Sequence, residues 1–182
     1  NGANFKSGDI KIWDNVDKKI TEADRKILGS TSPKFIASMV NSISYKGFDF
    51  SIFLYASVGA MLNNNIEYLN KPGRANSIVI DYWTPTNPTN AYPRPSVDNA
   101  SPAYVKSLQY EKADFIRVRN ITLGYTLPEK LLKKIRARKI RVYLSANNPF
   151  VITGFSGIDP EGARGYTAPS ASTWMGGVNL SF

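Results

Sequence analysis

The sequence contains no cysteine and no histidine. Without cysteine the chain can form no disulfide, no thiolate nucleophile and no cysteine-ligated metal site. Without histidine it lacks the commonest general base and the commonest metal ligand of proteins. A Ser-His-Asp triad and a histidine-bound zinc site are therefore excluded within these 182 residues. We predict no enzyme activity, no catalytic residue, no cofactor and no metal ligand.

Long hydrophobic runs are also missing. No stretch of 18 apolar residues occurs, which excludes a membrane-spanning helix. A membrane β-barrel remains possible, because its strands carry apolar residues only at alternate positions. The chain starts at Asn1 without a methionine or a targeting segment, so we expect an internal start and a fragment of a longer protein.

Charge is distributed unevenly along the chain. There are 23 Lys and Arg residues against 14 Asp and Glu, a formal net charge of +9. Between positions 130 and 141 all charges are basic: Lys130, Lys133, Lys134, Arg136, Arg138, Lys139 and Arg141. Such a patch is compatible with nucleic acid or with anionic lipid headgroups. We expect a solvated connection near the headgroups of a lipid bilayer, and no nucleic acid partner.

Apolar and polar residues alternate in five segments, which predicts antiparallel β-strands with one apolar face. The segments are residues 34–45, 48–57, 114–126, 139–152 and 173–182. In the last segment one face carries Trp174, Val178, Leu180 and Phe182. A strand of about ten residues, rising ~3.3 Å per residue and tilted by ~45°, covers roughly 23 Å. This is close to the ~25 Å apolar band of an outer-membrane barrel.

The segment 114–126 contains a break in its alternation. Ile116 and Val118 share one face, whereas Ile121 and Leu123 share the other. One extra residue transfers all following side chains of a strand to the opposite face. A β-bulge near Asn120 would place both groups on the same face.

The connections between these segments alternate between short and long. Lys46-Gly47 is typical of a tight hairpin, because glycine adopts the positive φ that such a turn requires. Residues 58–113 form a long loop, 127–138 a shorter connection, and 153–172 a second long loop. Outer-membrane barrels have short periplasmic turns and long outer loops. The sequence therefore predicts an all-β fold, an antiparallel transmembrane β-barrel with one short periplasmic helix and long extracellular loops.

The helix is predicted at residues 128–136. Pro128 fits its first position, where a missing N–H costs nothing. Leu131, Leu132 and Ile135 form one apolar stripe, which we expect to pack on the rim of the barrel.

Aromatic residues of the 58–113 loop are the candidates for contact with a ligand or a lid protein: Tyr82, Trp83, Tyr92 and Tyr104. Their rings could stack on sugars or pack the loop on itself. Asp159 and Glu161 suggest a hydrolase pair, but their place in a loop favours a structural role. Arg117 and Arg119 share a strand face and could tune selectivity from a lumen. A solvated or salt-bridged wall is the favoured interpretation of these arginines.

Several blocks of the sequence resemble SusC/RagA-type TonB-dependent transporters of Bacteroidota. They follow the order of the family: Gly8–Lys11, Asp24–Gly29, Ser32–Phe35, Ser44–Phe53, Arg117–Pro128, Asn147–Phe150 and Gly157–Glu161. Phe182 resembles the terminal insertion signal of outer-membrane barrels. The resemblance covers nearly the whole chain apart from residues 58–113, and its specificity comes from all blocks together.

The resemblance implies that residues 1–182 are the C-terminal part of a barrel of about 22 strands with a plugged lumen. The plug domain and the earlier strands would lie outside this chain. It implies an importer of oligosaccharides or peptides in the bacterial outer membrane, powered by TonB through the upstream region and capped by a SusD-like surface lipoprotein. A dimer of transporter–lid pairs is a further implication. The alternative is a soluble all-β glycan-binding module, which would stay in buffer without detergent.

The chain departs from this family in its Asp-rich segment, which in the family often resembles a calcium loop. Here Asp14-Asn15-Val16-Asp17 is followed by two lysines, and the glycine that permits the sharp turn is missing. We therefore expect a solvated loop at residues 14–24 rather than a bound calcium ion.

Overall fold

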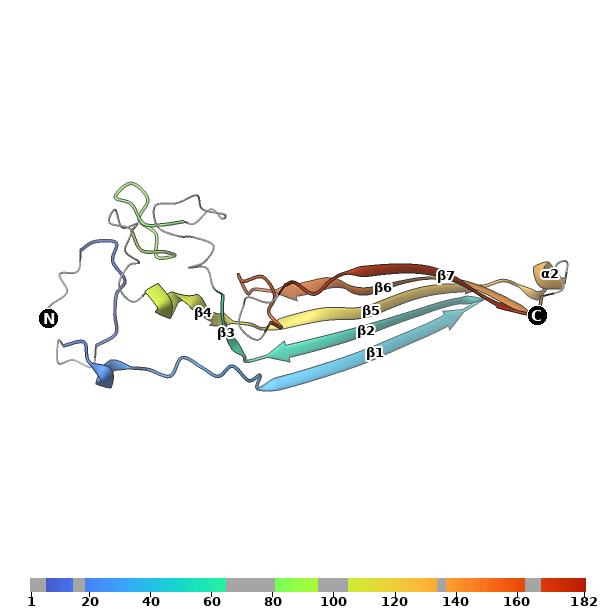
Figure 1. The fold of residues 1–182 in the computed structure, drawn as a ribbon, viewed down its shortest axis with the longest axis horizontal. Coiled ribbons are helices and arrows are strands. Elements are labelled where there is room, and N and C mark those ends of the chain that lie inside the picture. Colours follow the sequence, from blue (N-terminus) through green and yellow to red (C-terminus); the bar gives the residue numbers. More distant parts are fainter. Residues whose placement is uncertain (1–5, 15–18, 65–80, 95–104, 134–136, 163–167) are drawn as a thin grey trace.

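The computed structural model describes residues 6–14, 19–64, 81–94, 105–133, 137–162 and 168–182. Long antiparallel strands form one five-stranded sheet in the order β1-β2-β5-β6-β7. They are β1 (Phe35–Tyr45), β2 (Phe48–Val58), β5 (Phe115–Thr126), β6 (Lys139–Thr153) and β7 (Thr173–Ser181). Figure 1 shows the sheet as one layer, with the loops at one end and the short helix α2 (Glu129–Leu132) and the C terminus at the other. The strands predicted from alternation are confirmed.

Cross-strand register assigns each side chain to a face of the sheet, because paired residues of antiparallel strands point to the same side. Ile52, for example, pairs with Asn41 on one side and Ile121 on the other. The register gives an apolar face with Met39, Ile43, Phe50, Ile52, Leu54, Val118, Ile121, Leu123, Val142, Leu144, Trp174, Val178 and Leu180. The opposite face, called the polar face, carries Ser38, Ser42, Asp49, Ser51, Tyr55, Ser57, Arg117, Asn120, Thr122, Arg141, Ser145, Asn147, Thr173 and Asn179. The same face also carries the apolar residues Ile36, Val40, Phe53, Phe115, Val151 and Met175.

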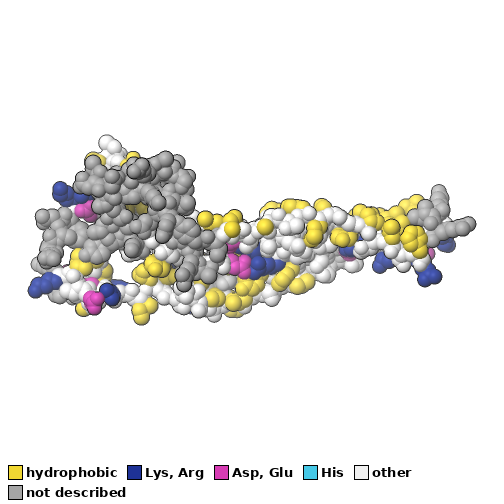
Figure 2. Space-filling model, viewed as in Figure 1, with side chains coloured by type: hydrophobic (Ala, Val, Ile, Leu, Met, Phe, Trp, Pro, Cys, Tyr) yellow, Lys and Arg dark blue, Asp and Glu magenta, His cyan; other side chains and the backbone are white. Residues whose placement is uncertain are grey.

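Within the described ranges, no second sheet covers the apolar face. On this face Trp174 is 60% exposed, Val178 56% and Leu180 57%. Figure 2 shows apolar side chains along the sheet for much of its length. A sandwich would bury such a face against a second sheet. The apolar face therefore needs an apolar neighbour outside the described part of the chain.

The break in alternation lies at Arg119. Phe53 of β2 pairs with Asn120, whereas the adjacent Leu54 pairs with Val118, so Arg119 is the extra residue of β5. The extra residue keeps the apolar residues before and after it on one face. The bulge predicted near Asn120 is confirmed.

The β1–β2 hairpin closes with the two-residue turn Lys46-Gly47. Both residues have positive φ, 46° and 88°, as a type I′ turn requires. The Gly47 carbonyl accepts a hydrogen bond of 2.7 Å from the Thr126 N–H, and a Cβ at Gly47 would lie 2.8 Å from the Thr126 carbonyl oxygen. The predicted tight turn is confirmed, and glycine is required there by backbone conformation and by space.

The connection after β5 differs in detail from the predicted helix. Pro128 is the N-cap residue with an extended backbone (ψ 147°), and the helix begins at Glu129, so its placement at the first helical position was wrong. Proline has nearly the same φ in both places, which is why sequence does not separate them. Of the predicted stripe, Leu132 is buried and Leu131 half exposed, while Ile135 lies outside the described residues. None of the helices in the described part of the chain is long and apolar enough to span a membrane.

The lack of periodicity in the segment 58–113 predicted one long loop. The structure shows that this prediction was wrong at both ends of the segment. β3 (Met61–Asn63) and β4 (Tyr110–Lys112) form a separate two-stranded antiparallel sheet, and the 3-10 helix η2 (Val105–Gln109) leads into β4. Strands of three residues are too short for alternation to be visible in a sequence. Leu62, Ala113 and Phe155 form a small apolar core beside them. Both ends of the long segment are thereby fastened to the loop end of the large sheet.

On the polar face an ion pair crosses the central strand. Arg141 Nε of β6 lies 2.9 Å from Asp49 Oδ1 of β2, with β5 between them. Gly124 is the β5 residue that pairs with Asp49. A Cβ at Gly124 would lie 2.6 Å from both carboxylate oxygens of Asp49. The missing side chain therefore makes room for the ion pair.

Gly124→Ala is expected to displace this ion pair, because the new methyl group needs the space of the Asp49 carboxylate. We expect the midpoint of urea unfolding of the whole protein in bilayers to fall by a few tenths of a molar. Gly176→Ala on the apolar face is the control, since the nearest atom to its Cβ is the Tyr143 carbonyl oxygen at 3.9 Å. Equal shifts for the two variants would contradict the assigned role of Gly124.

Candidate functional site

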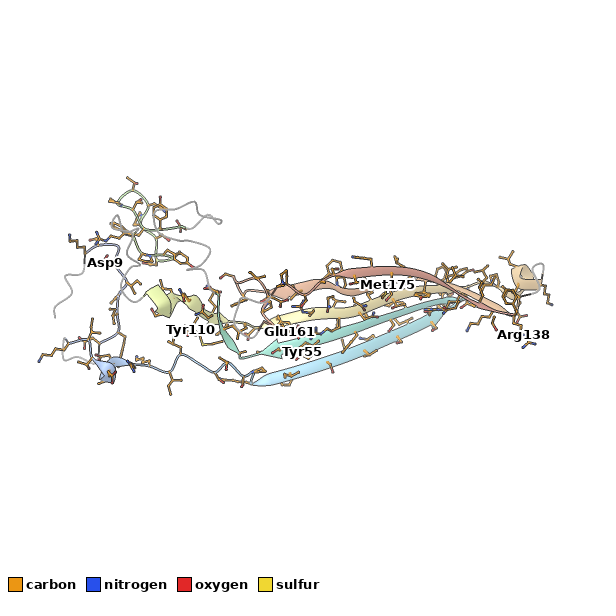
Figure 3. All side chains as sticks on the ribbon, in the orientation of Figure 1. Asp9, Tyr55, Tyr110, Arg138, Glu161 and Met175 are labelled. Carbon is orange, nitrogen blue, oxygen red and sulfur yellow. The ribbon has the colours of Figure 1, made fainter. Side chains whose placement is uncertain are left out.

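Two arginines of β5 meet two carboxylates of the β6–β7 loop on the polar face. Arg117 Nη2 lies 2.6 Å from Asp159 Oδ1, and the two side chains are only 3% and 6% exposed. Arg117 Nε lies 3.2 Å from Glu161 Oε2, and Arg119 forms a further ion pair with Glu161. These four residues are called the arginine–carboxylate cluster below. Figure 3 places Glu161 beside Tyr55 at the loop end of the sheet.

Aromatic rings flank both guanidinium groups of the cluster. The Arg119 Cζ lies 4.8 Å from the ring centroid of Tyr55, and the Arg117 Cζ lies 5.6 Å from that of Phe115. A guanidinium over an aromatic face is attracted by the negative charge of that face. The rings and the carboxylates together fix the orientation of both arginines.

Asp159 is the central acceptor of the loop. Its Oδ1 accepts a hydrogen bond of 2.9 Å from the Glu161 N–H, and its Oδ2 accepts two of 2.9 Å from the N–H and the hydroxyl of Ser170. Burial disfavours the charged form of Asp159. The hydrogen bonds and the attraction of Arg117 outweigh burial and hold the pKa of Asp159 below its ordinary value. The ionised carboxylate therefore ties both ends of the loop to the wall.

This attachment is expected to weaken only in acid. A carboxyl group whose pKa is lower in the folded state stabilises that state. Its full contribution is present at pH values above the pKa of the unfolded state, about 3.9 for Asp. The stabilisation is lost as pH falls through the folded-state pKa. Hydrogen exchange at the Ser170 amide should therefore keep its protection factor between about pH 7 and pH 5 and begin to lose it only as the pH falls below about 4. The Ala113 amide, which donates to the Ala60 carbonyl at 2.9 Å, is the internal control, and equal pH dependence of the two would contradict the assignment.

A second polar network attaches the same loop to β4. Ser156 Oγ donates to Glu111 Oε1 at 2.6 Å, and the Ser156 N–H donates to Glu111 Oε2 at 3.0 Å. Asn64, which is 1% exposed, donates from Nδ2 to Ser156 Oγ at 3.2 Å and also to Glu111. The buried amide group of Asn64 is satisfied in this way, and a satisfied buried polar group favours one arrangement of the backbone. The two loop regions are thereby held against each other.

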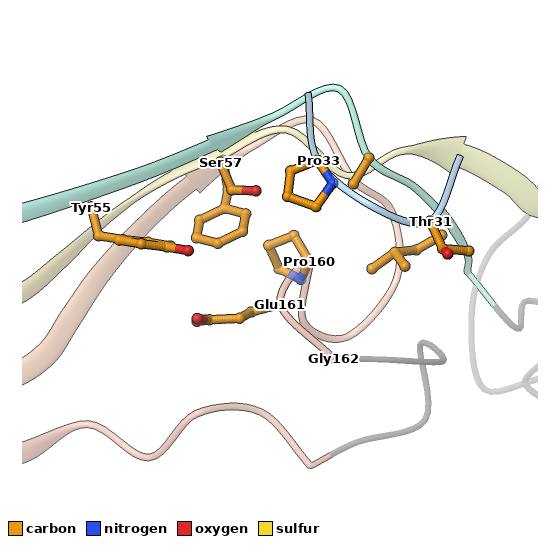
Figure 4. Close-up of a pocket in the computed structure, with 10 residues that line it drawn as sticks. Thr31, Pro33, Tyr55, Ser57, Pro160, Glu161 and Gly162 are labelled. Atoms are coloured by element: carbon orange, nitrogen blue, oxygen red, sulfur yellow. The ribbon is translucent and has the colours of Figure 1, made fainter. Parts of the chain in front are cut away.

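A cavity of about 270 Å³ lies between the polar face and the β6–β7 loop. Its lining comes from the strands (Tyr55, Ser57, Phe115), from the loop (Pro160, Glu161, Gly162), from the segment before β1 (Thr31, Pro33) and from Ala60 and Leu62. Figure 4 shows Tyr55 and Glu161 at one end of this cavity and Thr31 at the other. The ring centroids of Tyr55 and Phe115 are 5.9 Å apart. The site thus combines aromatic rings, hydroxyl groups and a carboxylate.

The aromatic residues proposed for ligand or lid contact are partly brought together. Tyr82 and Tyr92 pair in an isolated parallel bridge, and the Trp83 N–H donates to the Tyr92 carbonyl at 3.1 Å. Tyr82 is 46% exposed, whereas burial and the negative charge of Glu111 raise the pKa of Tyr92. Tyr104 lies outside the described residues. Among Tyr82, Trp83 and Tyr92, which the structure describes, Tyr82 is the one most open to contact from outside.

Trp83 packs against the N-terminal segment. A Cβ on Gly8, whose φ is 87°, would lie 2.6 Å from Cδ2 of the Trp83 ring. Beside it Arg94 Nε lies 2.7 Å from Asp9 Oδ1, and the Arg94 N–H donates to the Gly8 carbonyl at 2.8 Å. In this structure Trp83 therefore joins residues 6–14 to the long loop.

The Asp-rich segment at 14–24 is described only in part, since residues 15–18 lie outside the described ranges. The side chain of Asp24 takes part in the N-terminal capping box of the 3-10 helix η1 (Glu22–Asp24). The N–H of the N-cap residue Thr21 donates to Asp24 Oδ2 at 2.7 Å. Among the residues that the structure describes, no three Asp or Glu side chains are grouped so that they could hold a metal ion. The expectation of a loop without calcium stays a prediction.

The basic connection lies at the other end of the sheet from the arginine–carboxylate cluster. Figure 3 places Arg138 at the end of the sheet where Figure 1 marks the C terminus, and the Arg138 N–H donates to the Ser181 carbonyl at 2.8 Å. Lys130 and Lys133 are exposed, while Lys134 and Arg136 lie outside the described residues. Lys130 and Lys133 therefore remain open to solvent or headgroups, whereas Arg141 is paired with Asp49.

Sequence reasoning named all members of the arginine–carboxylate cluster but did not join them. The arginines were interpreted as a wall and the carboxylates as a loop feature, and the salt-bridged wall is confirmed. Arg-x-Arg and Asp-x-Glu have equal spacing and opposite charge, and their ion pairs bring them together at one place on the sheet. This complementarity is the signal that could have linked them. Because each carboxylate is engaged by an arginine, the cluster holds a loop in place rather than forming a hydrolase pair.

Comparison with known proteins gives consistent results. No protein-family model matches the chain. The chain is 35% identical over 145 residues to "TonB-dependent receptor P3" of Formosa agariphila, and 30% identical over 179 residues to "TonB-dependent receptor SusC" of Bacteroides thetaiotaomicron. These matches cover 79% and 92% of this chain but only 14% and 17% of the relatives. The chain therefore spans less than a fifth of the length of these two relatives.

The fold is similar to solved structures of the RagAB peptide importer. The TM-score is 0.70 for its open-open state and 0.69 for its closed-closed state, at 25% and 27% sequence identity. The matches cover 94% and 90% of this chain, and 20% and 19% of those chains. The single sheet and its loops thus correspond to about one fifth of a much longer chain.

Proposed function

We propose that the strands of this chain, which belongs to the SusC/RagA-type family of TonB-dependent transporters, form part of the barrel wall of a nutrient importer. Receptors of this family are proteins of the bacterial outer membrane, and the fold of this chain is that of an antiparallel membrane barrel segment. The apolar face contacts lipid, and the polar face lines the interior. The loop end of the sheet is the extracellular end, and α2 is on the periplasmic side.

The two-sided character of the uncovered sheet carries this proposal. One face carries mainly apolar residues from β1 to β7, and the other carries most of the polar and charged residues of the sheet. Membrane barrels alternate apolar and polar residues in this way because one face meets hydrocarbon and the other meets water or a plug. Lipid therefore supplies the apolar neighbour that the described residues do not.

The transported molecules are oligosaccharides or peptides, and a SusD-like surface lipoprotein caps the barrel. One relative carries the name SusC, and the similar structures are of a peptide importer. Residues 1–182 would be the C-terminal part of the barrel, with the plug and the region that TonB contacts elsewhere in the protein. Substrate is captured under the lid, and TonB then drives rearrangement of the plug. This segment closes the wall and shapes the outer vestibule.

Specific roles follow for individual residues. Tyr82 is the described aromatic residue best exposed for contact with substrate or lid. Phe182, which is 76% exposed, would be the signal for barrel insertion. Two transporter–lid pairs would associate as a dimer.

Uptake by living cells tests the function. A strain that lacks the whole transporter should lose uptake of one fluorescent oligosaccharide or peptide from a panel, and deletion of TonB should cause the same loss. A tagged transporter should retain a surface lipoprotein through purification in mild detergent. Uptake that persists in both deletion strains would contradict the proposal.

A soluble glycan-binding module is the alternative function. It predicts that the whole protein stays in buffer without detergent, with the apolar face covered by further strands. Phase partitioning of the whole protein in a cloud-point detergent distinguishes the transporter from the soluble module. The transporter partitions with detergent, and recovery in the aqueous phase would support the module.

A further inference from the structure

We propose that the cavity between the polar face and the β6–β7 loop is a subsite for one neutral sugar ring of the imported molecule. This rests on the proposed function, since the polar face must line the interior for an imported molecule to reach it. The cavity lies at the loop end of the sheet, where an incoming molecule first meets the wall (Figure 4). Its residues come from strands and loop together, so the tethered loop shapes it.

The volume limits the occupant to a small unit. Drug-sized ligands occupy pockets of about 300–1,000 Å³, and this cavity measures about 270 Å³. One ring of a longer chain fits such a space, while the rest of that chain continues into the lumen. The site would therefore recognise part of an oligomer.

The lining is apolar on its walls and polar at several points. The rings of Tyr55 and Phe115 provide flat apolar surface. Within the part of the chain that the structure describes, the hydroxyl groups of Thr31, Tyr55 and Ser57 have no side-chain hydrogen-bond partner. A pyranose presents apolar C–H faces and a rim of hydroxyl groups. It would match both properties of the lining at once.

The charge of the site favours a neutral occupant. Glu161 is the carboxylate of the cavity, and it is already paired with Arg117 and Arg119. Its negative charge is thereby compensated, so it attracts a peptide amino group or a lysine only weakly. A carboxylate has about four acceptor positions, which leaves places for hydroxyl donors. Hydroxyl groups of a sugar can use these places without adding charge.

The β2 backbone at the cavity offers no free edge for a peptide strand. Tyr55 and Ser57 each pair with residues on both β1 and β5, so β2 has a neighbour on each side. Binding of a peptide as an added strand requires an edge with free N–H and C=O groups. A peptide therefore cannot bind here as a strand added to β2, whereas a sugar ring requires no strand edge.

Saturation-transfer difference NMR on the purified whole protein in detergent micelles tests the subsite. The probes are glucose, galactose, mannose and the dipeptide Ala-Ala, each added alone. We expect saturation transfer to at least one hexose. Ser57→Leu, which fills the cavity, and Tyr55→Ala, which removes a wall, should each reduce this signal at least tenfold. Tyr143→Ala, which removes an aromatic ring from the polar face further along β6, is the matched control and should retain it.

The absence of a signal from every hexose, a hexose signal that survives Ser57→Leu, or a signal from Ala-Ala alone would overturn the proposal. Uptake by cells separates this failure from failure of the transport function. If TonB-dependent uptake is present and the hexose signal is absent, only the subsite is refuted. If uptake is absent, the transport function itself fails.

Discussion

Arg117→Ala is expected to detach the β6–β7 loop from the wall. The substitution leaves Asp159, which is 6% exposed, without its guanidinium partner. Removal of one member of a buried ion pair costs about 3–5 kcal/mol, because the other charge stays buried and uncompensated. Each step of about 1.4 kcal/mol is a factor of ten in an equilibrium. The Ser170 amide should therefore lose roughly two to four orders of magnitude of hydrogen-exchange protection.

The control for this variant is Arg25→Ala. Arg25 is paired with Glu22, but the two side chains are 77% and 85% exposed, so we expect almost no change in stability. If Arg117→Ala behaved like Arg25→Ala, the buried pair would not be what holds the loop.

A charge on the apolar face is expected to have the second large effect. Ile52 lies near the middle of β2 on this face. A lysine at the midplane of a bilayer costs a barrel about 2–4 kcal/mol. Ile52→Lys should therefore lower the free energy of unfolding in bilayers by about that amount. Guanidinium titration of the whole protein in lipid vesicles, followed by the mobility of the unheated barrel in gels, measures this change.

Ser51→Lys is the matched control for Ile52→Lys. Ser51 is the adjacent residue on the polar face, and its hydroxyl is 3.3 Å from that of Ser42. A lysine on this face can extend into the interior of the barrel, so its cost should be small. An equal loss for the two variants would show that β2 does not separate lipid from lumen.

The strands and the bulge could be predicted because their signal is local. Side chains of a strand alternate with a period of two, so the change of parity between Val118 and Ile121 indicated an extra residue before any pairing was known. The Lys46-Gly47 turn was predictable for the same reason, since the required φ belongs to the residues themselves. The family resemblance added the membrane and the orientation, which alternation alone does not give.

The features that sequence missed depend on distant contacts. Arg117 and Asp159 are separated by 42 positions, and neither residue alone indicates its partner. The short strands β3 and β4 pair across the whole long loop, and three residues show no periodicity. Pro128 satisfies the same φ as an N-cap or as a first helical residue. In each case the decisive information is tertiary.

Spin labels along β2 test the central claim most directly. The chain contains no cysteine, so a single cysteine introduced at each position from Phe50 to Tyr55 gives one labelled site within it. In bilayers, collisions with oxygen should peak at Phe50, Ile52 and Leu54, and collisions with a water-soluble nickel chelate should be lowest there. A profile without this period of two, or nickel access at Ile52 and Leu54 equal to that at Ser51, would contradict a wall with lipid on one face and the transport path on the other.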